Sequence, residues 1–115
     1  MAAYVKNKEL REQLIISKAD DKLTPLALDM MILMANRFSC KFQYVYPEDR
    51  EDCIAFAIID CYSYWRNYNP EKSPNAFAYI TQVIKNGYAK GWRKLYQDVP
   101  KSSRVRLSSG NIYSL

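Results

Sequence analysis

The chain has 115 residues, 49% of them hydrophobic, which suits one compact domain and excludes a wholly disordered protein. Its 17 Lys and Arg residues exceed its 12 Asp and Glu residues, and the net charge of +5 favours an anionic partner or simply a soluble surface. Cys40, Cys53 and Cys61 lack CxxC spacing and the chain has no histidine to complete a zinc site, so we expect reduced, buried thiols in a cytoplasm. The longest apolar run, MMILMA, is too short for a bilayer core of ~30 Å, so no membrane partner is expected.

Helical periodicity dominates the first two thirds of the chain. Proline and glycine are scarce before residue 70 and alternating β-branched residues are absent, which predicts an all-α protein. In residues 7–18, Leu10, Leu14 and Ile15 recur at helical spacing, and Asn7 is the expected N-cap.

Two further helices are expected before the turn at residues 69–75, NPEKSPN. Residues 22–42 place Thr24 as an N-cap and Pro25 at the first helical position, and they are apolar on nearly every side. We therefore expect a central, buried helix there. A third helix is expected over residues 47–68, beginning at Pro47.

The third helix begins with a group of carboxylates, where negative charge suits a helix N-terminus. They are Glu48, Asp49, Glu51 and Asp52. A divalent ion is the alternative explanation, but the helix dipole is the simpler one, and we predict neither a metal site nor a cofactor. One stripe of this helix is expected in the core: Ile54, Ile58, Cys61 and Trp65. Phe56 and Ile59 lie away from that stripe, so either a neighbouring helix covers them or they form an exposed apolar patch for a partner.

Residues 74–94, PNAFAYITQVIKNGYAKGWRK, combine helical periodicity with rings and cations. One half of the helical wheel is an apolar stripe: Phe77, Ile80, Val83, Ile84, Gly87 and Gly91. The other half interleaves amides, cations and rings: Gln82, Lys85, Asn86, Ala89, Trp92, Arg93 and Tyr96. Because cations neutralise phosphates, amides reach base edges and rings stack on unpaired bases, this half suits DNA. The alternative is that the rings complete a small core and the lysines provide solubility.

The chain therefore predicts a helical domain over residues 1–96, built as a small bundle of about four helices. Residues 97–115 are polar, basic and aperiodic and are expected to form a flexible tail. There is no GxSxG motif, no glycine-rich phosphate loop and no histidine, so we do not expect an enzyme.

Three segments resemble the late-transcription sigma factors of T-even-type bacteriophages, which are short and divergent relatives of bacterial sigma factors. They are YVKNKEL, LALDMMILMANRFSCKF, and FAYITQ with the basic residues after it, and the resemblance covers roughly residues 4 to 95. It implies a fold like sigma-factor domain 2. It also implies a protein that binds host core RNA polymerase and directs recognition and melting of an A/T-rich, −10-like late promoter, in the cytoplasm of an infected bacterium at the nucleoid. The alternative is a helical adaptor or inhibitor that binds RNA polymerase or DNA without initiating transcription.

The resemblance also implies a polymerase-binding surface on residues 52–68, DCIAFAIIDCYSYWRNY. In sigma factors, the corresponding helix docks on the clamp helices, a coiled coil of the polymerase beta-prime subunit. Carried over, the docking residues are Asp52, Ala55, Phe56, Ile59 and Asp60. Ala55, Phe56 and Ile58 replace polar residues of the family, so a more apolar contact is expected.

For DNA, Phe77 takes the position of a family aromatic residue that stacks on a base flipped from the promoter, and Tyr79 is a second candidate. Ile80 and Thr81 replace the paired tryptophans that are common in primary sigma factors. The implied DNA-binding set is Phe77, Tyr79, Gln82, Lys85, Asn86, Trp92 and Arg93.

The C-terminal segment GNIYSL raises a further hypothesis. In the phage family, a short hydrophobic and acidic C-terminal motif binds the sliding clamp, which activates late transcription together with a coactivator. Here Ile112, Tyr113 and Leu115 are candidate anchors for the sliding clamp or the polymerase flap, but the acidic residues are absent. The alternative is a disordered tail whose basic residues touch DNA phosphates, namely Lys101, Arg104 and Arg106.

Overall fold

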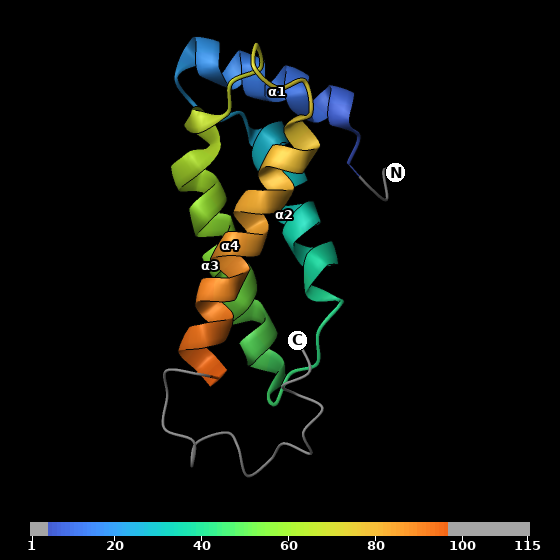
Figure 1. Ribbon diagram of the computed structural model, residues 1–115, viewed down its shortest axis with the longest axis vertical. Helices are drawn as coiled ribbons and strands as arrows, with labels where there is room; N and C mark the ends of the chain where they lie inside the picture. The colour runs from blue at the N-terminus through green and yellow to red at the C-terminus, as the bar shows by residue number, and fades with distance from the viewer. Residues whose placement is uncertain (1–4, 97–115) are drawn as a thin grey trace.

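The computed structural model describes residues 5–96, and in these residues all regular structure is helical (Figure 1). The helices are α1 Asn7–Asp20, α2 Pro25–Ser39, α3 Pro47–Tyr64 and α4 Ala76–Tyr96, with a short 3-10 turn, η1 Trp65–Asn67, after α3. α2, α3 and α4 run along the long axis, and α1 lies across one end (Figure 1). The prediction of a small all-α bundle is confirmed. No helix within the described range is both long and apolar enough to span a membrane.

A side-chain cap sets the start of α2 but not that of α1. Thr24 caps α2 as predicted, because its Oγ1 accepts a hydrogen bond from the backbone N–H of Ala27 at 3.1 Å, and Pro25 occupies the first turn. Asn7 does not cap α1, whose N-cap is the preceding residue, so that prediction was wrong. Instead, Asn7 Oδ1 accepts a hydrogen bond of 2.9 Å from the backbone N–H of Phe77 in the first turn of α4.

Polar side chains hold α1 over the connection between α3 and α4. Lys18 Nζ donates to the carbonyl oxygens of Arg66 and Tyr68, both at 2.8 Å. Arg11 Nη2 donates to the carbonyl oxygen of Pro70 at 3.2 Å. These bonds satisfy carbonyl groups of the connection, and they fix α1 across the end of the bundle.

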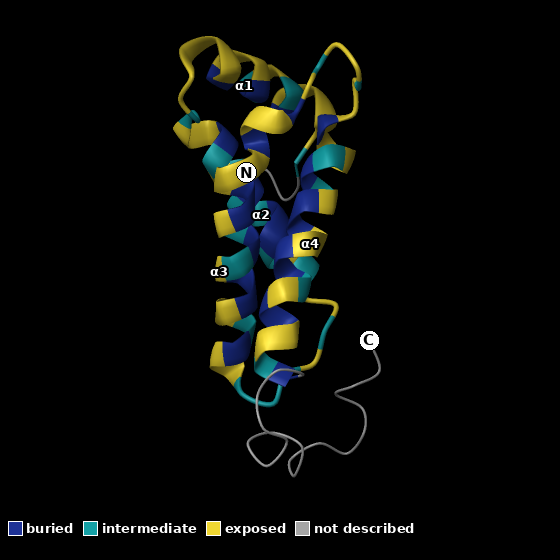
Figure 2. Ribbon diagram, turned by 60° about the vertical axis from the view of Figure 1, so that its left-hand side comes forward, coloured by how far each residue is buried: buried dark blue, intermediate teal, exposed yellow. Residues whose placement is uncertain are grey.

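The core positions of α1 and α2 follow the sequence pattern only in part. Leu10 and Leu14 are fully buried, whereas Ile15 is exposed. α2 buries one side of the helix, through Ala27, Met31, Met34, Ala35 and Ser39. Leu26 is exposed, so the prediction that α2 is buried on nearly every side was wrong. The buried positions of the helices face one another in the centre of the bundle (Figure 2).

α3 and α4 run antiparallel and form the most extensive helix–helix contact in the described residues (Figure 1). Two glycines of α4 permit this contact. A Cβ atom on Gly87 would lie 2.8 Å from Ala57 Cα and 2.8 Å from the carbonyl oxygen of Phe56, and one on Gly91 would lie 3.0 Å from Phe56 Cδ2. At Gly87 the two backbones therefore approach too closely for any side chain.

We expect Gly87→Ala to destabilise the protein by about 1–3 kcal/mol, the usual cost of overpacking a well-packed contact. Alanine favours a helix by about 1 kcal/mol over glycine, but the new Cβ atom would meet backbone atoms of α3, which cannot move aside as a flexible side chain can. Urea unfolding followed by far-ultraviolet circular dichroism measures the change. Asn86→Ala, at the exposed neighbouring position, is the control and should not destabilise. A Gly87→Ala protein as stable as the parent would contradict the close approach.

A buried polar cluster joins the end of α4 to the start of α3. Asp49 is 2% exposed, and its Oδ2 accepts a hydrogen bond of 2.6 Å from the hydroxyl of Tyr96. The Tyr96 Oη in turn accepts from the backbone N–H of Val45 at 3.1 Å. Asp49 therefore does more than complement the helix dipole. Tyr96 is buried, so its predicted outward position was wrong.

None of the three cysteines of the described residues is in a disulfide, but their thiols differ in exposure. Cys53 and Cys61 are completely buried, whereas Cys40 is exposed, so the expectation of three buried thiols was wrong for Cys40. Burial, together with a smaller contribution from the nearby Asp60 carboxylate, raises the pKa of the Cys61 thiol to about 12. Cys61 is therefore a protonated core residue at neutral pH.

Candidate nucleic-acid interface

All the formal charges on the side chains of α4 are positive. Its 21 residues include Lys85, Lys90, Arg93 and Lys94 and contain no Asp or Glu. A helix of this length extends for about 32 Å, and the four cations lie between its middle and its C-terminal end. Lys85, Arg93 and Lys94 are exposed and form no ion pair within residues 5–96. Such side chains can neutralise nucleic-acid phosphates.

Two exposed amides lie beside these cations, one helical turn apart. Gln82 Nε2 donates a hydrogen bond of 3.0 Å to Asn86 Oδ1. The bond holds both side chains on the outer surface of α4 and leaves an acceptor on Gln82 and a donor on Asn86. Amides with this capacity can reach base edges or phosphate oxygens.

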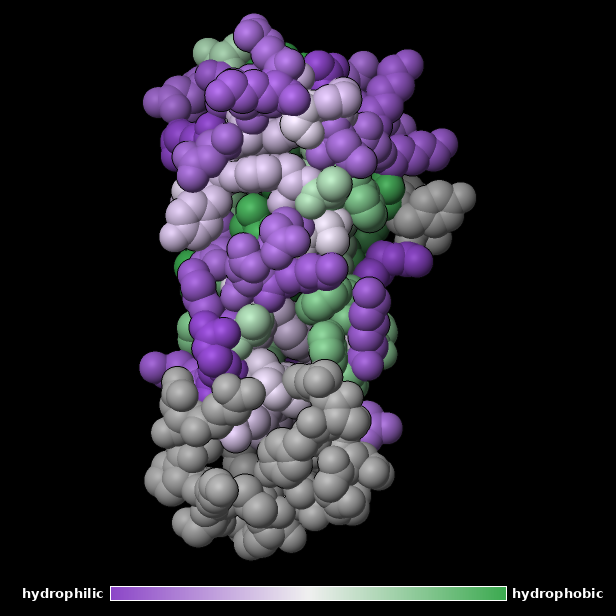
Figure 3. Space-filling model, in the orientation of Figure 1, coloured by the Kyte–Doolittle hydropathy of each residue, from purple (hydrophilic) through white to green (hydrophobic). Residues whose placement is uncertain are grey.

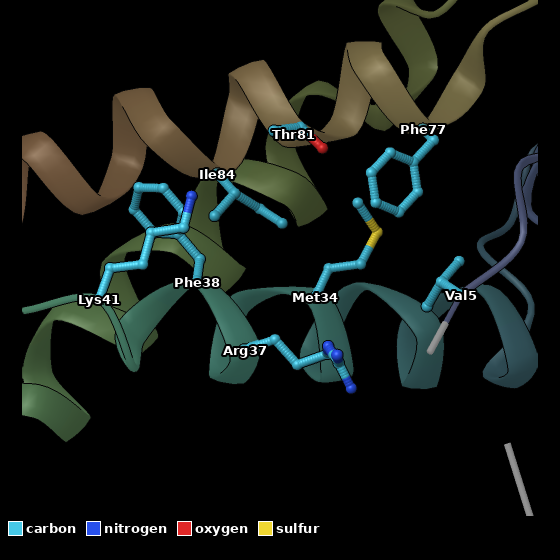
Figure 4. A pocket seen from close by; sticks show the side chains of 8 residues that line it. All are labelled: Val5, Met34, Arg37, Phe38, Lys41, Phe77, Thr81 and Ile84. Atoms are coloured by element: carbon cyan, nitrogen blue, oxygen red, sulfur yellow. The ribbon is translucent and has the colours of Figure 1, made fainter. Parts of the chain in front are cut away.

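Phe77 stands at the N-terminal end of α4 and is 39% exposed. It lines a hollow of about 410 Å³ between α4 and α2, into which it extends toward Met34 (Figure 4). Arg37 and Lys41 of the α2 side also line this hollow. Although the helical wheel placed Phe77 on the apolar stripe, its ring is partly open to solvent, in a hollow that two cations also line, and is therefore accessible for stacking.

Tyr79 is more constrained than Phe77. Its hydroxyl donates to the carbonyl oxygen of Tyr64 at 2.8 Å, and its ring centroid lies 5.5 Å from that of Tyr68. Burial raises the pKa of the Tyr79 hydroxyl, and the nearby Cys61 adds to the shift. The ring lines a hollow of about 550 Å³ between α3 and α4. The two predicted stacking rings therefore belong to different hollows, one on each side of α4.

Trp92, predicted to face DNA, is 5% exposed. Its ring centroid lies 4.4 Å from that of Tyr96 and 5.7 Å from that of Phe42. The prediction that Trp92 lies on the outer half of the helix was therefore wrong. The residue belongs to an aromatic cluster that forms part of a third hollow, of about 300 Å³, on the α2 side of α4.

The hollows on the two sides of α4 differ in charge. The hollow between α3 and α4 includes the carboxylate of Asp60 as well as the cations Lys90 and Arg93. The two hollows on the α2 side have no acidic residue in their lining and contain the cations Arg37, Lys41, Lys85 and Arg93. In the space-filling view, apolar surface lies along α2 beside hydrophilic side chains (Figure 3). The α2 side is therefore better suited to an anionic ligand that carries aromatic rings, such as a nucleotide.

The predicted polymerase-binding residues divide into two groups. Asp52, Ala55 and Ile59 are exposed, and Ile59 is 59% exposed. Phe56 is half-buried and packs at Gly91 of α4. Phe56 and Ile59 were expected either to be covered by a neighbouring helix or to form an exposed patch. Each alternative holds for one residue, because α4 covers Phe56 and leaves Ile59 exposed. The exposed strip continues to Tyr62, which is 61% exposed.

Asp60, the fifth of these residues, is only 7% exposed and is paired within the domain. Lys90 Nζ donates to its two carboxylate oxygens at 2.9 and 3.2 Å and lies 5.7 Å from the centroid of the Tyr64 ring. The hydrogen bond to Asp60 raises the pKa of the Lys90 ammonium group. Sequence reasoning did not single out Lys90, because nothing in the local pattern links it to a residue 30 positions away.

Within the described range, no three His, Cys, Asp or Glu residues are grouped so that they could hold a metal ion. The candidate anchors Ile112, Tyr113 and Leu115 lie outside the described residues, as do the basic residues of the predicted tail. Comparison with protein-family models, with curated proteins and with solved structures found no match to this chain.

Proposed function

We propose that this protein is an initiation factor of the phage late sigma type. It would bind core RNA polymerase through the exposed strip of α3 and promoter DNA through α4. The observation that supports DNA binding most directly is the absence of acidic residues on α4, together with the half-exposed ring of Phe77 in a hollow that two cations also line. Binding of unpaired bases uses both cations for the phosphates and an accessible ring for stacking, whereas a solubilising surface needs only the charges.

The proposed role includes capture of a base from an A/T-rich, −10-like late promoter. Extruding a base costs a few kcal/mol, and stacking on one aromatic ring returns about 1–3 kcal/mol. One accessible ring can offset this cost only when the polymerase already holds the DNA. The isolated protein should therefore bind promoter DNA weakly, and specificity should appear in the complex with polymerase in the cytoplasm of an infected bacterium. The same proposal includes a contact with a sliding clamp or the polymerase flap, assisted by a late coactivator. The candidate anchors for this contact are Ile112, Tyr113 and Leu115.

Transcription in vitro tests this function. A supercoiled plasmid that carries an A/T-rich late-type promoter is transcribed by bacterial core polymerase with and without the protein. We expect a discrete transcript only when the protein is present. Polymerase binding without a transcript, even with sliding clamp and coactivator supplied, would reject the initiation role.

A second candidate function is a helical adaptor or inhibitor that binds polymerase without opening DNA. The exposed apolar side chains of Ile59 and Tyr62 support it, since they provide a protein-binding surface that needs no DNA. An adaptor has no use for an accessible ring at Phe77, so variants at that position separate the two functions.

A further inference from the structure

We propose that the 300 Å³ hollow between α4 and the segment that follows α2 binds one unpaired nucleotide. The base would lie against the aromatic cluster of Phe42, Tyr88 and Trp92, and the phosphate would lie at Lys85 and Arg93. This site is separate from Phe77, which lines a different hollow nearer the N-terminal end of α4.

The walls of the hollow are aromatic. The rings of Phe42 and Tyr88 are stacked, with centroids 5.1 Å apart and an interplanar angle of 22°. Phe38 meets Tyr88 edge to face at 5.1 Å, and Trp92 lies 5.7 Å from Phe42. Tyr88 and Trp92 are buried, whereas Phe38 and Phe42 are half-buried and keep some ring surface accessible. Aromatic surface of this kind stacks on any nucleobase, because every base has a flat π face.

The hydroxyl of Tyr88 indicates that the hollow is suited to a polar ligand. Tyr88 is 2% exposed, and its oxygen is buried without a hydrogen-bond partner within the described residues. A buried hydroxyl without a partner costs free energy, and such groups commonly mark a missing ligand or an ordered water. The oxygen is closed to solvent in this structure, so the exocyclic and ring atoms of a base can supply the partner once the rings around the hydroxyl move apart.

The charge of the hollow selects an anion. Lys85 and Arg93 are exposed, form no ion pair within residues 5–96, and line the hollow together with Ala89, which leaves space between them. No acidic residue is part of its lining. The volume lies at the lower end of the range of about 300–1,000 Å³ for small-molecule sites, so it suits one nucleotide. The lining of the hollow alone indicates a nucleotide. That this nucleotide belongs to a DNA strand rests on the proposed function.

Fluorescence anisotropy at low salt can test the site with the full-length chain alone, without polymerase. The probes are labelled octathymidylate and an abasic octamer with the same number of phosphates. We expect Tyr88→Phe to lower the affinity for octathymidylate roughly threefold to tenfold, as loss of one hydrogen bond does, and to leave the affinity for the abasic octamer unchanged. The thermal midpoint should stay the same or rise, because the variant removes a buried group that has no partner.

Lys85→Gln and Arg93→Gln should lower the affinity for both octamers, since they remove phosphate contacts. Lys22→Gln, an equal change of charge at an exposed position before α2, is the matched control and should have little effect. Unlabelled thymidine monophosphate, added as a competitor, identifies the source. If thymidine monophosphate displaces octathymidylate from the parent protein but not from Tyr88→Phe, the site binds free nucleotides. If it does not displace octathymidylate, the site binds a strand.

Two results would overturn the proposal. One is equal affinity of the parent protein for the abasic octamer and octathymidylate, which would leave no role for a base. The other is an unchanged affinity of Tyr88→Phe for octathymidylate, which would indicate a bound water rather than a ligand at the hydroxyl. Because this assay contains no polymerase, a failure of the initiation role in transcription would not affect its outcome.

Discussion

Replacing Phe77 with alanine is expected to lower the rate of promoter opening about fivefold to 150-fold, which corresponds to loss of one base stack of about 1–3 kcal/mol. Polymerase binding should be unchanged, because Phe77 lies on α4 and the proposed docking strip lies on α3. Permanganate reactivity of melted thymines measures opening, and co-elution with core polymerase measures binding.

The exposure of Phe77 makes this prediction separable from an effect on folding. At 39% exposure the ring contributes less to the core than a buried side chain does, so the variant should retain its helical circular dichroism and most of its stability. Phe77→Tyr retains a stacking ring and should restore opening, whereas Phe77→Leu retains an apolar side chain and should not. Loss of opening, polymerase binding and helical signal together would instead make Phe77 a core residue.

The helices were predictable because their signals are local. Pro25 and Thr24 begin α2 through chemistry within one turn, and Pro47 begins α3 in the same way. The core stripe of α3 also follows from periodicity, since Ile54, Cys61 and Trp65 are buried and Ile58, partly buried, packs against them in the core.

The caps and the buried aromatic residues depended on distant parts of the chain. The side chain of Asn7 bonds to α4 rather than α1 because the bundle brings residue 77 beside it. The wheel placed Trp92 away from the apolar stripe, but it could not show that the segment after α2 folds back over that side. Phe42 and Tyr44 of this segment lie 5.7 and 5.9 Å from the Trp92 ring and cover it. A helical wheel describes one helix and contains no information about which neighbours cover it.

A pattern within one helix also could not show which charged residues pair with a neighbouring helix. Asp60 belonged to the predicted docking surface because the resemblance to sigma factors placed it there together with its neighbour Ile59. In the fold, the two side chains have different environments, since Asp60 turns to Lys90 of α4 and Ile59 remains 59% exposed. An ion pair between helices is a property of their packing, so only the α3–α4 contact could identify it.

This difference changes which residue best tests polymerase binding. Phe56 was the natural choice from the sequence, but its ring packs at Gly91, so Phe56→Asp would disturb the α3–α4 contact as well as any docking surface. Loss of binding by that variant would not distinguish the two causes. Ile59 avoids this problem because its side chain is mostly in solvent.

Replacing Ile59 with aspartate is expected to weaken binding to core polymerase about 30-fold or more, the effect of removing a central interface residue worth at least about 2 kcal/mol. A carboxylate at this position would be desolvated within an apolar contact, and Asp52 of the same strip already supplies negative charge. Biolayer interferometry with immobilised core polymerase measures the affinity, and the thermal midpoint should change little. Ile16→Asp, at a 45% exposed isoleucine of α1, is the matched control and should bind normally. If Ile59→Asp binds as tightly as the parent while Ile16→Asp does not, the docking surface lies on α1 and the α3 assignment is wrong.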